Sequence, residues 1–295
     1  MPLVNTERQA ALILIFGTVL ASLGWIFSKE TIAGLPPFAF VGLRFVLASI
    51  FLLPFCYKAL KVASWQDLKG ASLVGCLLAL ALMSWIYAIS ISDTLGEGAF
   101  ILSLSMLMVP LIAWALFKQR PQRIFWFALP IAVSGLAFLS LGSGWSQSSS
   151  QLIFLLNALI LALHFNVNSI YAKKLPVLLL TCVQLMVTGL LSLVASLLFE
   201  TFPQQVELNI WGWFAASTVL ATALRYVMQT TGQKGLTPGN AALIMILEPV
   251  WTVFLSIIWY AEALTTNKVV GCSLILFSLI LYRTNGKLAR LTNKE

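Results

Sequence analysis

The chain has 295 residues, of which 60% are hydrophobic and only 9% are charged, whereas soluble globular proteins carry about 25% charged residues. This composition excludes an ordinary soluble domain and predicts a polytopic membrane protein, with the lipid bilayer as its first partner. The formal net charge of +8 does not indicate nucleic acid as a partner, because the basic residues stand in short clusters between apolar runs.

Ten apolar segments follow one another along the chain, and each is predicted to be a helix that crosses the membrane. About 20 residues are enough to span the hydrocarbon layer. The expected fold class is therefore all-α and integral to the membrane. The ten predicted helices cover residues 10–31, 37–57, 69–91, 96–117, 123–142, 151–172, 176–199, 209–232, 239–260 and 266–283.

The basic residues fall mainly on one of the two sides that these ten helices define. If the N-terminus is cytoplasmic, 14 of the 18 lysine and arginine residues are cytoplasmic too. This bias predicts a multi-pass protein of the cytoplasmic (inner) membrane with both termini in the cytoplasm. The fourteen residues are Arg8, Lys58, Lys61, Lys69, Lys118, Arg120, Arg123, Lys173, Lys174, Lys234, Arg283, Lys287, Arg290 and Lys294.

The chain also repeats itself. The segments that begin at Gly98 and Asn240 each have a small-residue start, an apolar helix with an internal proline, and a polar stop. The two prolines, Pro110 and Pro249, are expected to let their helices bend. The serine-rich stretch of residues 143–150 is predicted to be a flexible connector, and it divides the chain into domains 1–147 and 148–295.

Each domain contains five predicted helices. Because five is an odd number, the second copy enters the membrane from the other side, and the two inverted copies are related by a pseudo-twofold axis in the membrane plane. This architecture recurs in secondary transporters, where the substrate site lies near the midplane between the copies.

Short motifs occur in a characteristic order in both halves. They are Gly24-Trp25, Lys29, Pro37, Arg44, Gly98-Ala99-Phe100, Val109-Pro110 and Arg120-Pro121 in the first half, and Gln233-Lys234, Ala241-Ala242, Glu248-Pro249, Glu262 and Gly271 in the second. Together they resemble the drug/metabolite transporter superfamily, specifically its EamA-like ten-helix members, over nearly the whole chain.

Three positions depart from the family pattern. Gly24-Trp25 reverses the usual Trp-Gly, Ala261-Glu262 replaces Gly-Glu, and His164-Phe165 stands where a tryptophan is usual. The resemblance implies a transporter of metabolites, amino acids or drugs across the cytoplasmic membrane, commonly in the outward direction. Because of the departure in the sixth helix, the resemblance does not define the chemistry of the pocket.

Glu248 lies about 14 Å into the ninth predicted helix, near the middle of the hydrocarbon layer, and Pro249 follows it. A carboxylate at this depth is costly unless it is paired, protonated or facing water. Glu248 is therefore a candidate for binding a substrate amine or exchanging a proton. The alternative is an interhelical hydrogen bond that fixes the position of this helix.

Two cations lie in the first two predicted helices. Arg44, about 10 Å into the second helix, either holds a substrate carboxylate with two parallel hydrogen bonds or forms a structural clamp. The clamp would bind carbonyl groups or an acid near the outer face, such as Glu30 or Glu97. Lys29 either faces the substrate or extends its amine to the outer membrane surface.

Arg225 lies in the middle of the eighth predicted helix, beside Tyr226. A charge inside the membrane is a functional hypothesis by default, so both residues are candidates for contact with the substrate. Pairing of Arg225 with Glu248 would lower the cost of both charges. Such a pair would act as a structural lock or as a substrate-sensitive switch.

His164 is the only histidine, and Asn168 follows it one turn later on the same face of the sixth helix. Imidazole titrates near neutrality, which allows a role in coupling transport to protons. The alternative is a hydrogen-bonded packing residue, as most histidines on apolar helices are. Gln184 on the seventh helix is expected to line the same cavity.

Aromatic side chains inside the predicted helices either line a cavity for amphipathic or aromatic substrates or fill space between helices. Both interpretations stay open from the sequence. These residues are Trp25, Trp85, Tyr87, Trp114 and Trp251.

The function predicted is that of a secondary transporter, with export as the expected direction, that alternates access around a central cavity. Its substrates would be small metabolites such as amino acids or drugs, driven by the substrate gradient or by protons, in a monomer or a dimer. The alternative is a membrane receptor or scaffold that transports nothing. No ATP-binding or hydrolase motif is present, so we predict no enzyme activity, no cofactor, no metal site and no catalytic residues.

Overall fold

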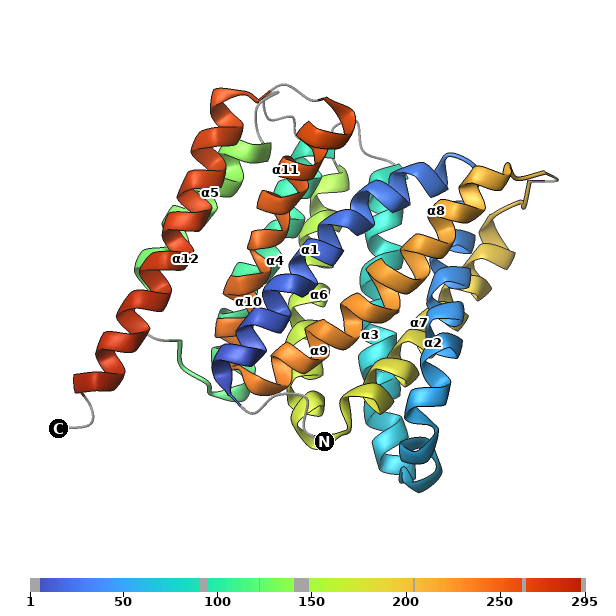
Figure 1. The fold of residues 1–295 in the computed structure, drawn as a ribbon, viewed down its shortest axis with the longest axis horizontal. Coiled ribbons are helices and arrows are strands. Elements are labelled where there is room, and N and C mark those ends of the chain that lie inside the picture. The colour runs from blue at the N-terminus through green and yellow to red at the C-terminus, as the bar shows by residue number, and fades with distance from the viewer. Residues whose placement is uncertain are drawn as a thin grey trace.

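The computed structural model describes residues 6–90, 95–121, 123–140, 149–203, 205–261 and 264–292. All secondary structure in these ranges is helical (Figure 1), which confirms the all-α prediction. The elements are α1 (Glu7–Ile32), α2 (Pro37–Val62), α3 (Trp65–Ser90), α4 (Leu95–Phe117), α5 (Phe125–Ser140), α6 (Ser149–Lys174), α7 (Val177–Phe199), α8 (Leu208–Thr218), the π-helix η1 (Val219–Leu224), α9 (Arg225–Gly235), α10 (Pro238–Met245), α11 (Leu247–Tyr260) and α12 (Thr266–Thr292).

Several of these elements continue one another. Helices α8, η1 and α9 follow without a gap, and α10 and α11 are separated only by Ile246, so the described residues form ten rods in the order of the ten predicted segments. Six rods are long and apolar enough to cross a membrane, namely α1, α2, α3, α6, α7 and α10–α11. That all ten rods cross the membrane stays a prediction.

Two predicted helix ends were too early. Helix α2 runs to Val62 instead of residue 57, and α12 runs to Thr292 instead of residue 283. An apolar run marks only the part of a helix that lies in lipid. The backbone hydrogen bonds continue into the lysine- and arginine-rich flanks, because those residues are good helix formers.

Local sequence explains where several helices begin. Thr6 is the N-cap of α1, and its side chain accepts a hydrogen bond from the Gln9 amide. Thr237 caps α10 in the same way, and Pro238 occupies the first turn, where its missing N–H costs nothing. Such caps define the turns between rods.

The two halves are inverted relative to each other. Helices α2 and α7, the second rod of each half, pack antiparallel, because Ser49 Oγ donates to the Cys182 carbonyl at 2.8 Å while the amide of Phe38 reaches Glu200. Helices α5 and α12, the fifth rods, are antiparallel too. Ser278 Oγ donates to the Ala128 carbonyl at 2.9 Å, while Gly135, later in α5, lies against Gly271, earlier in α12. Equivalent helices that run in opposite directions establish the inverted repeat.

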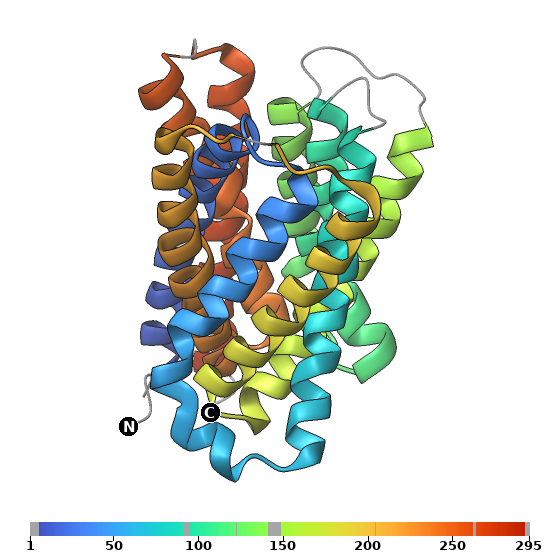
Figure 2. The same cartoon turned by 90° about the vertical axis from the view of Figure 1, so that its right-hand side faces the viewer.

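The remaining contacts follow the same symmetry. Helix α6 of the second half packs on α3 and α4, and α1 of the first half packs on the α8–α9 and α10–α11 rods. Each half therefore completes the other instead of forming a separate bundle (Figures 1 and 2). The predicted boundary at residues 147 and 148, within the serine-rich connector, lies outside the described residues and stays a prediction.

Small residues let the two central helices approach closely. An added Cβ at Gly189 of α7 would lie 2.6 Å from the backbone nitrogen of Val46, and one at Gly42 of α2 would lie 2.9 Å from the backbone nitrogen of Leu193. Backbone contact of this kind is how membrane helices gain packing energy where the hydrophobic effect does not act.

The start of α1 and the end of α12 lie at the same end of the bundle, here called the termini end (Figure 2). The loop between α1 and α2 lies at the opposite end. Both predicted cytoplasmic termini thus share one side, as the ten-helix prediction requires.

Candidate substrate site

The helix that carries Glu248 is interrupted just before it. Helix α10 ends at Met245 and α11 begins at Leu247. Pro249 has no N–H to donate to the carbonyl of Met245 four residues earlier, which accounts for the interruption. Glu248 therefore lies in the first turn of α11, about 15 Å from the start of the rod.

The other predicted bending residue behaves differently. Helix α4 runs without interruption from Leu95 to Phe117, past Pro110. An added Cβ on Gly239 would be 3.6 Å from the Pro110 ring, so Pro110 packs against the start of α10. A bending role for Pro110 stays a prediction.

Glu248 is the centre of a polar cluster that both halves of the chain build. Its Oε2 lies 3.5 Å from Arg225 Nη2, and its Oε1 accepts a hydrogen bond of 3.1 Å from Trp25 Nε1. The Trp25 ring meets the Trp85 ring edge to face, with centroids 5.7 Å apart. We call Trp25, Trp85, Arg225 and Glu248 the central cluster. Its members come from α1, α3, α9 and α11.

The structure thus contains the pairing of Arg225 with Glu248 that the sequence suggested. Both side chains are about one-fifth exposed, so the pair is neither sealed in the core nor fully open. This partial exposure is what a ligand would need to reach the two charges.

A π-helix places Arg225 in this cluster. Helix η1 ends at Leu224, directly before Arg225. Within it, Thr222 Oγ1 donates to the Ser217 carbonyl five residues earlier at 3.0 Å. A π-helical turn inserts extra chain into an α-helix and rotates the residues that follow, and such turns are frequent at functional sites.

Thr222 also accepts a hydrogen bond from Arg44, the second arginine inside the predicted membrane helices. Arg44 Nε donates to Thr222 Oγ1, and its Nη1 donates to Ser28 Oγ at 3.0 Å. Arg44 is only 8% exposed and lies over the rings of Phe40 and Phe45. Among the described residues its partners are hydroxyl groups, not the carbonyl groups or outer acids that the sequence suggested for a clamp.

Glu30, one of those suggested acids, has another partner. Its Oε1 accepts a hydrogen bond of 2.8 Å from the Tyr260 hydroxyl, and Lys29 Nζ lies 4.1 Å from the centroid of the same Tyr260 ring. Lys29 therefore belongs to a group nearer the opposite end than the central cluster. The side chain of Glu97 lies outside the described residues.

Three aromatic candidates have different surroundings. Tyr226 is buried and packs its ring on Phe45 at 5.6 Å, within the apolar core. Tyr87 on α3 is more than half exposed. Trp251, one turn after Glu248, has a buried Nε1 without a hydrogen-bond partner among the described residues.

His164, Asn168 and Gln184 belong to a second polar group between α6, α7 and α9. His164 Nε2 lies 3.4 Å from Gln184 Oε1, and Asn168 Nδ2 donates to Gln233 Oε1 and to Thr230 Oγ1. His164, Asn168 and Gln184 are each at most 1% exposed. The structure thus separates these residues from the central cluster, in which none of them has a direct contact among the described side chains.

Sequence reasoning missed several polar partners in these two groups. Ser28 follows Trp25 by three residues, and Thr222 precedes Arg225 by three, so each is close on the same helix face. This spacing is the one sequence signal that could have identified Ser28 and Thr222. The missed residues are Ser28, Thr222, Thr230 and Gln233.

Between the central cluster and the termini end, the two halves pack tightly. Leu14 of α1 lies against Gly232 of α9, where an added Cβ would come within 2.8 Å of the Leu14 side chain. Asn166 of α6 donates to the Val109 carbonyl of α4 at 3.0 Å. An apolar cluster fills this region, with Ala10, Ala11, Leu14, Val109, Ala162, Phe165, Leu236, Ala241, Ala242, Ile244 and Met245.

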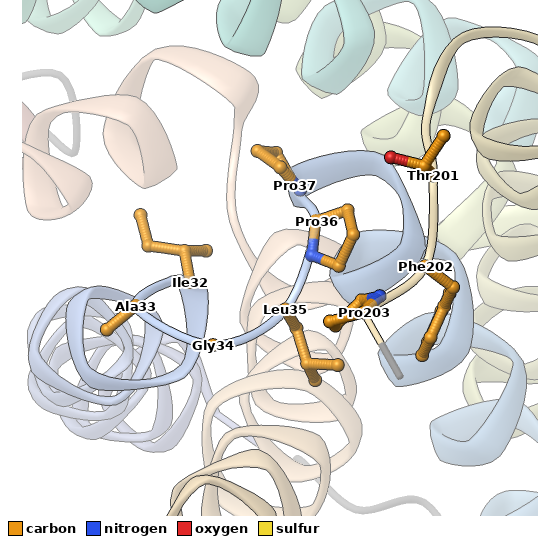
Figure 3. Close-up of a pocket in the computed structure, with 9 residues that line it drawn as sticks. All are labelled: Ile32, Ala33, Gly34, Leu35, Pro36, Pro37, Thr201, Phe202 and Pro203. Atoms are coloured by element: carbon orange, nitrogen blue, oxygen red, sulfur yellow. The ribbon is translucent and has the colours of Figure 1, made fainter. Parts of the chain in front are cut away.

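Two surface hollows lie at the ends of the bundle. One of about 410 Å³ is formed by the α1–α2 loop and the segment after α7, with Leu35, Pro36 and Pro203 in its wall (Figure 3). The other, about 160 Å³, is at the termini end between Pro110 and Tyr282. Neither is lined by a central-cluster residue.

The inverted repeat and the charged cluster between its halves define a class of integral membrane proteins that move solutes. The model of the EamA-like transporter family matches this chain twice, over residues 8–141 and 148–284. The chain belongs to the EamA-like transporter family, which confirms the resemblance, and it is a membrane transporter.

Named relatives agree with this assignment. The chain is 26% identical to an uncharacterized transporter of Archaeoglobus fulgidus, over 86% of this chain and 79% of the relative. It is 24% identical to an uncharacterized transporter of Synechocystis sp., over 94% and 90%. The uncharacterized transporter YoaV of Bacillus subtilis is 21% identical, over 88% and 91%.

A solved crystal structure has the same fold. It superposes with a TM-score of 0.83 over 96% of this chain and 99% of the other, at 16% sequence identity. At that identity the likeness concerns the fold alone.

Proposed function

We propose that this protein is a secondary transporter that exports small organic metabolites, such as amino acids or drugs, by alternating access around the central cluster. It lies in the cytoplasmic (inner) membrane with both termini in the cytoplasm, and it has no enzyme activity. The substrate gradient or protons supply the energy. Of the predicted site residues, Trp25, Trp85, Arg44, Arg225 and Glu248 carry the substrate contact most directly.

The observation that carries this proposal is the partly exposed ion pair of Arg225 and Glu248 at 3.5 Å, which lies in the second half and is joined to the first half by the hydrogen bond from Trp25 to Glu248. Charges inside a membrane protein are expensive and are kept where they line a solute path. The hydrogen bond from Trp25 to Glu248 crosses between the two inverted halves. It therefore changes its geometry when one half rocks against the other, which is the motion that alternating access requires.

The packing on the two sides of the cluster supports an outward-facing state. Toward the termini end, α1, α4, α6 and α10 close on one another through the apolar cluster around Leu14 and Val109. Within the central cluster, Trp25 retains 41% exposure. An inward-facing state would require these cytoplasmic contacts to separate.

The second polar group fits a supporting role. His164 Nδ1 and Gln184 Nε2 are buried without hydrogen-bond partners among the described residues, and buried polar atoms of this kind are satisfied by water or ligand. Both lie on helices of the second half, His164 on α6 and Gln184 on α7. We assign His164, Asn168 and Gln184 to the wall of the cavity in the inward-facing state.

Flux into proteoliposomes tests the function. The purified protein is reconstituted, the vesicles are loaded with one unlabelled candidate solute, and counterflow of the labelled solute is measured over a panel of amino acids and organic acids. The proposal is supported if some solute shows counterflow, if the Glu248→Gln variant reduces that counterflow, and if the Glu207→Gln variant leaves it unchanged. Binding without flux across the panel favours the receptor or scaffold.

Cysteine labelling tests the orientation. With the four native cysteines replaced by serine, Ala63→Cys lies between α2 and α3 at the termini end, and Thr201→Cys lies after α7 at the opposite end. An impermeant maleimide added to whole cells should label Thr201→Cys only. Labelling of Ala63→Cys alone would reverse the proposed topology.

A further inference from the structure

The described charges within and beside the central cluster do not balance. Arg225 and Arg44 are both positive, and Glu248 is the acidic group paired with either of them among the described side chains. Arg44 donates to Thr222, which lies three residues before Arg225 on the same rod. Among the described side chains, the site therefore carries one positive charge more than its acid neutralises, a situation that proteins rarely leave without a counter-ion.

Arg44 contributes this charge in a fixed position. Its Nε and Nη1 are held by the hydroxyls of Thr222 and Ser28, and its guanidinium lies over the rings of Phe40 and Phe45. Hydroxyl groups orient a guanidinium without neutralising it. A buried arginine held in this way raises the electrostatic potential at the neighbouring site and favours negative charge there.

Arg225 offers an unused face to a ligand. Glu248 contacts it through one oxygen and one terminal nitrogen, at the long distance of 3.5 Å. Arg225 Nε is buried and has no hydrogen-bond partner among the described residues. The pair of Nε and a terminal nitrogen is the edge of a guanidinium that binds a carboxylate with two parallel hydrogen bonds.

The surroundings of this edge are aromatic. The Trp25 ring is 41% exposed and is braced by Trp85, so it offers an apolar face beside the charge. Lys29 and Glu30, one turn further along α1, carry opposite charges and meet at Tyr260. They add no net charge to the balance.

From these contacts we infer that the substrate of this transporter is an organic anion whose carboxylate binds Arg225 in place of Glu248 while its apolar body lies on Trp25. The inference rests on the proposed function and specifies its substrate class. Substrate and Glu248 compete for one guanidinium, so the ion pair opens when the anion binds and closes when it leaves. Trp25 Nε1 keeps Glu248 in place while the pair is open.

Matched ligands with a common skeleton test the sign of the charge. Calorimetric titration of the purified full chain in detergent uses phenylacetate, phenylacetamide and phenethylamine, and then hexanoate, hexanamide and hexylamine. We expect each carboxylate to bind at least tenfold more tightly than its amide and its amine. The Lys174→Gln variant, which removes a positive charge at the termini end, should keep the same preference.

Two variants test the competition. Glu248→Gln removes the competing carboxylate and should tighten binding of the carboxylates at least threefold. The double variant Arg225→Gln with Glu248→Gln removes both charges and so leaves neither unpaired. It should bind each carboxylate and its amide with equal affinity. Arg225→Lys keeps the charge but loses the planar edge, and should weaken carboxylate binding at least fivefold.

The inference is overturned if the amines bind most tightly and the Glu248→Gln variant no longer binds them. That result would mean that the site binds cations. The absence of a carboxylate preference in both ligand sets would overturn it as well. The counterflow assay separates this failure from that of the function. If only amines are transported, the protein is a transporter but its substrate is not an organic anion. If carboxylates bind selectively and nothing is transported, the anion site is supported and the transport function is contradicted.

Discussion

Arg225 and Glu248 meet at 3.5 Å although neither would lie where it does in a regular helix. Arg225 begins α9 directly after a π-helical segment, and Glu248 lies in the first turn of α11 directly after an interruption. Two departures from α-helical geometry, one in each rod, thus flank the two charges. Both rods belong to the second half of the chain, and Trp25 from the first half completes the arrangement.

Glu248→Gln should slow counterflow at least tenfold with little change in stability. The amide keeps an acceptor for Trp25 Nε1 but no longer competes for Arg225, so a bound anion is not released. A partly exposed ion pair contributes about 1 kcal/mol to folding, so the midpoint of thermal unfolding in detergent should fall by only a few degrees. Equal losses of flux and thermal stability would make Glu248 a purely structural acid.

Pro249→Ala should reduce the rate of counterflow at least threefold without changing ligand affinity. Alanine restores the N–H that bonds to the Met245 carbonyl, which removes the interruption at Ile246 and stiffens the α10–α11 rod. Pro110→Ala is the matched control, because α4 is already continuous at that residue. The rates are measured as initial counterflow velocities. If they fall equally in both variants, the interruption at Ile246 has no special role.

Gly189→Ala should destabilise the protein by about 1–3 kcal/mol, the usual cost of overpacking. Its Cβ would lie 2.6 Å from the backbone nitrogen of Val46, so two helix backbones must move apart. Gly212→Ala in α8 is the control, since nothing lies within 4 Å of its Cβ, and it should leave stability unchanged or raise it by up to about 1 kcal/mol. Thermal unfolding in detergent compares the two, and equal effects would contradict the close packing of α2 on α7.

Glu200→Ala should destabilise the start of α2 by about 1–2 kcal/mol. The Glu200 carboxylate at the end of α7 accepts hydrogen bonds from the amides of Phe38 and Ala39, at 2.7 Å and 2.8 Å, so one half of the chain caps a helix of the other. Hydrogen exchange at these two amides should increase. Glu207→Ala is the control, because Glu207 makes no side-chain hydrogen bond to α8, and faster exchange in both variants would argue against capping.

Much of the fold could be predicted because lipid imposes strong rules on sequence. Apolar runs of about 20 residues marked the rods, and the distribution of basic residues placed both termini on one side. The prolines at 110 and 249 marked equivalent rods. The pairing of Arg225 with Glu248 followed from the cost of leaving either charge alone in a membrane.

The sequence alone determined that this chain is a helical membrane protein with a repeat, that its buried charges need partners, and that it resembles a transporter family. Only the tertiary structure decided that hydroxyls hold Arg44, that His164 lies in a separate group, and that Arg225 has an unused edge. The reason is physical: periodicity and hydropathy are properties of neighbours along the chain. The partner of a buried polar group depends on how helices from distant segments rotate and pack, and here on a π-helical turn that leaves no recognisable pattern in the sequence.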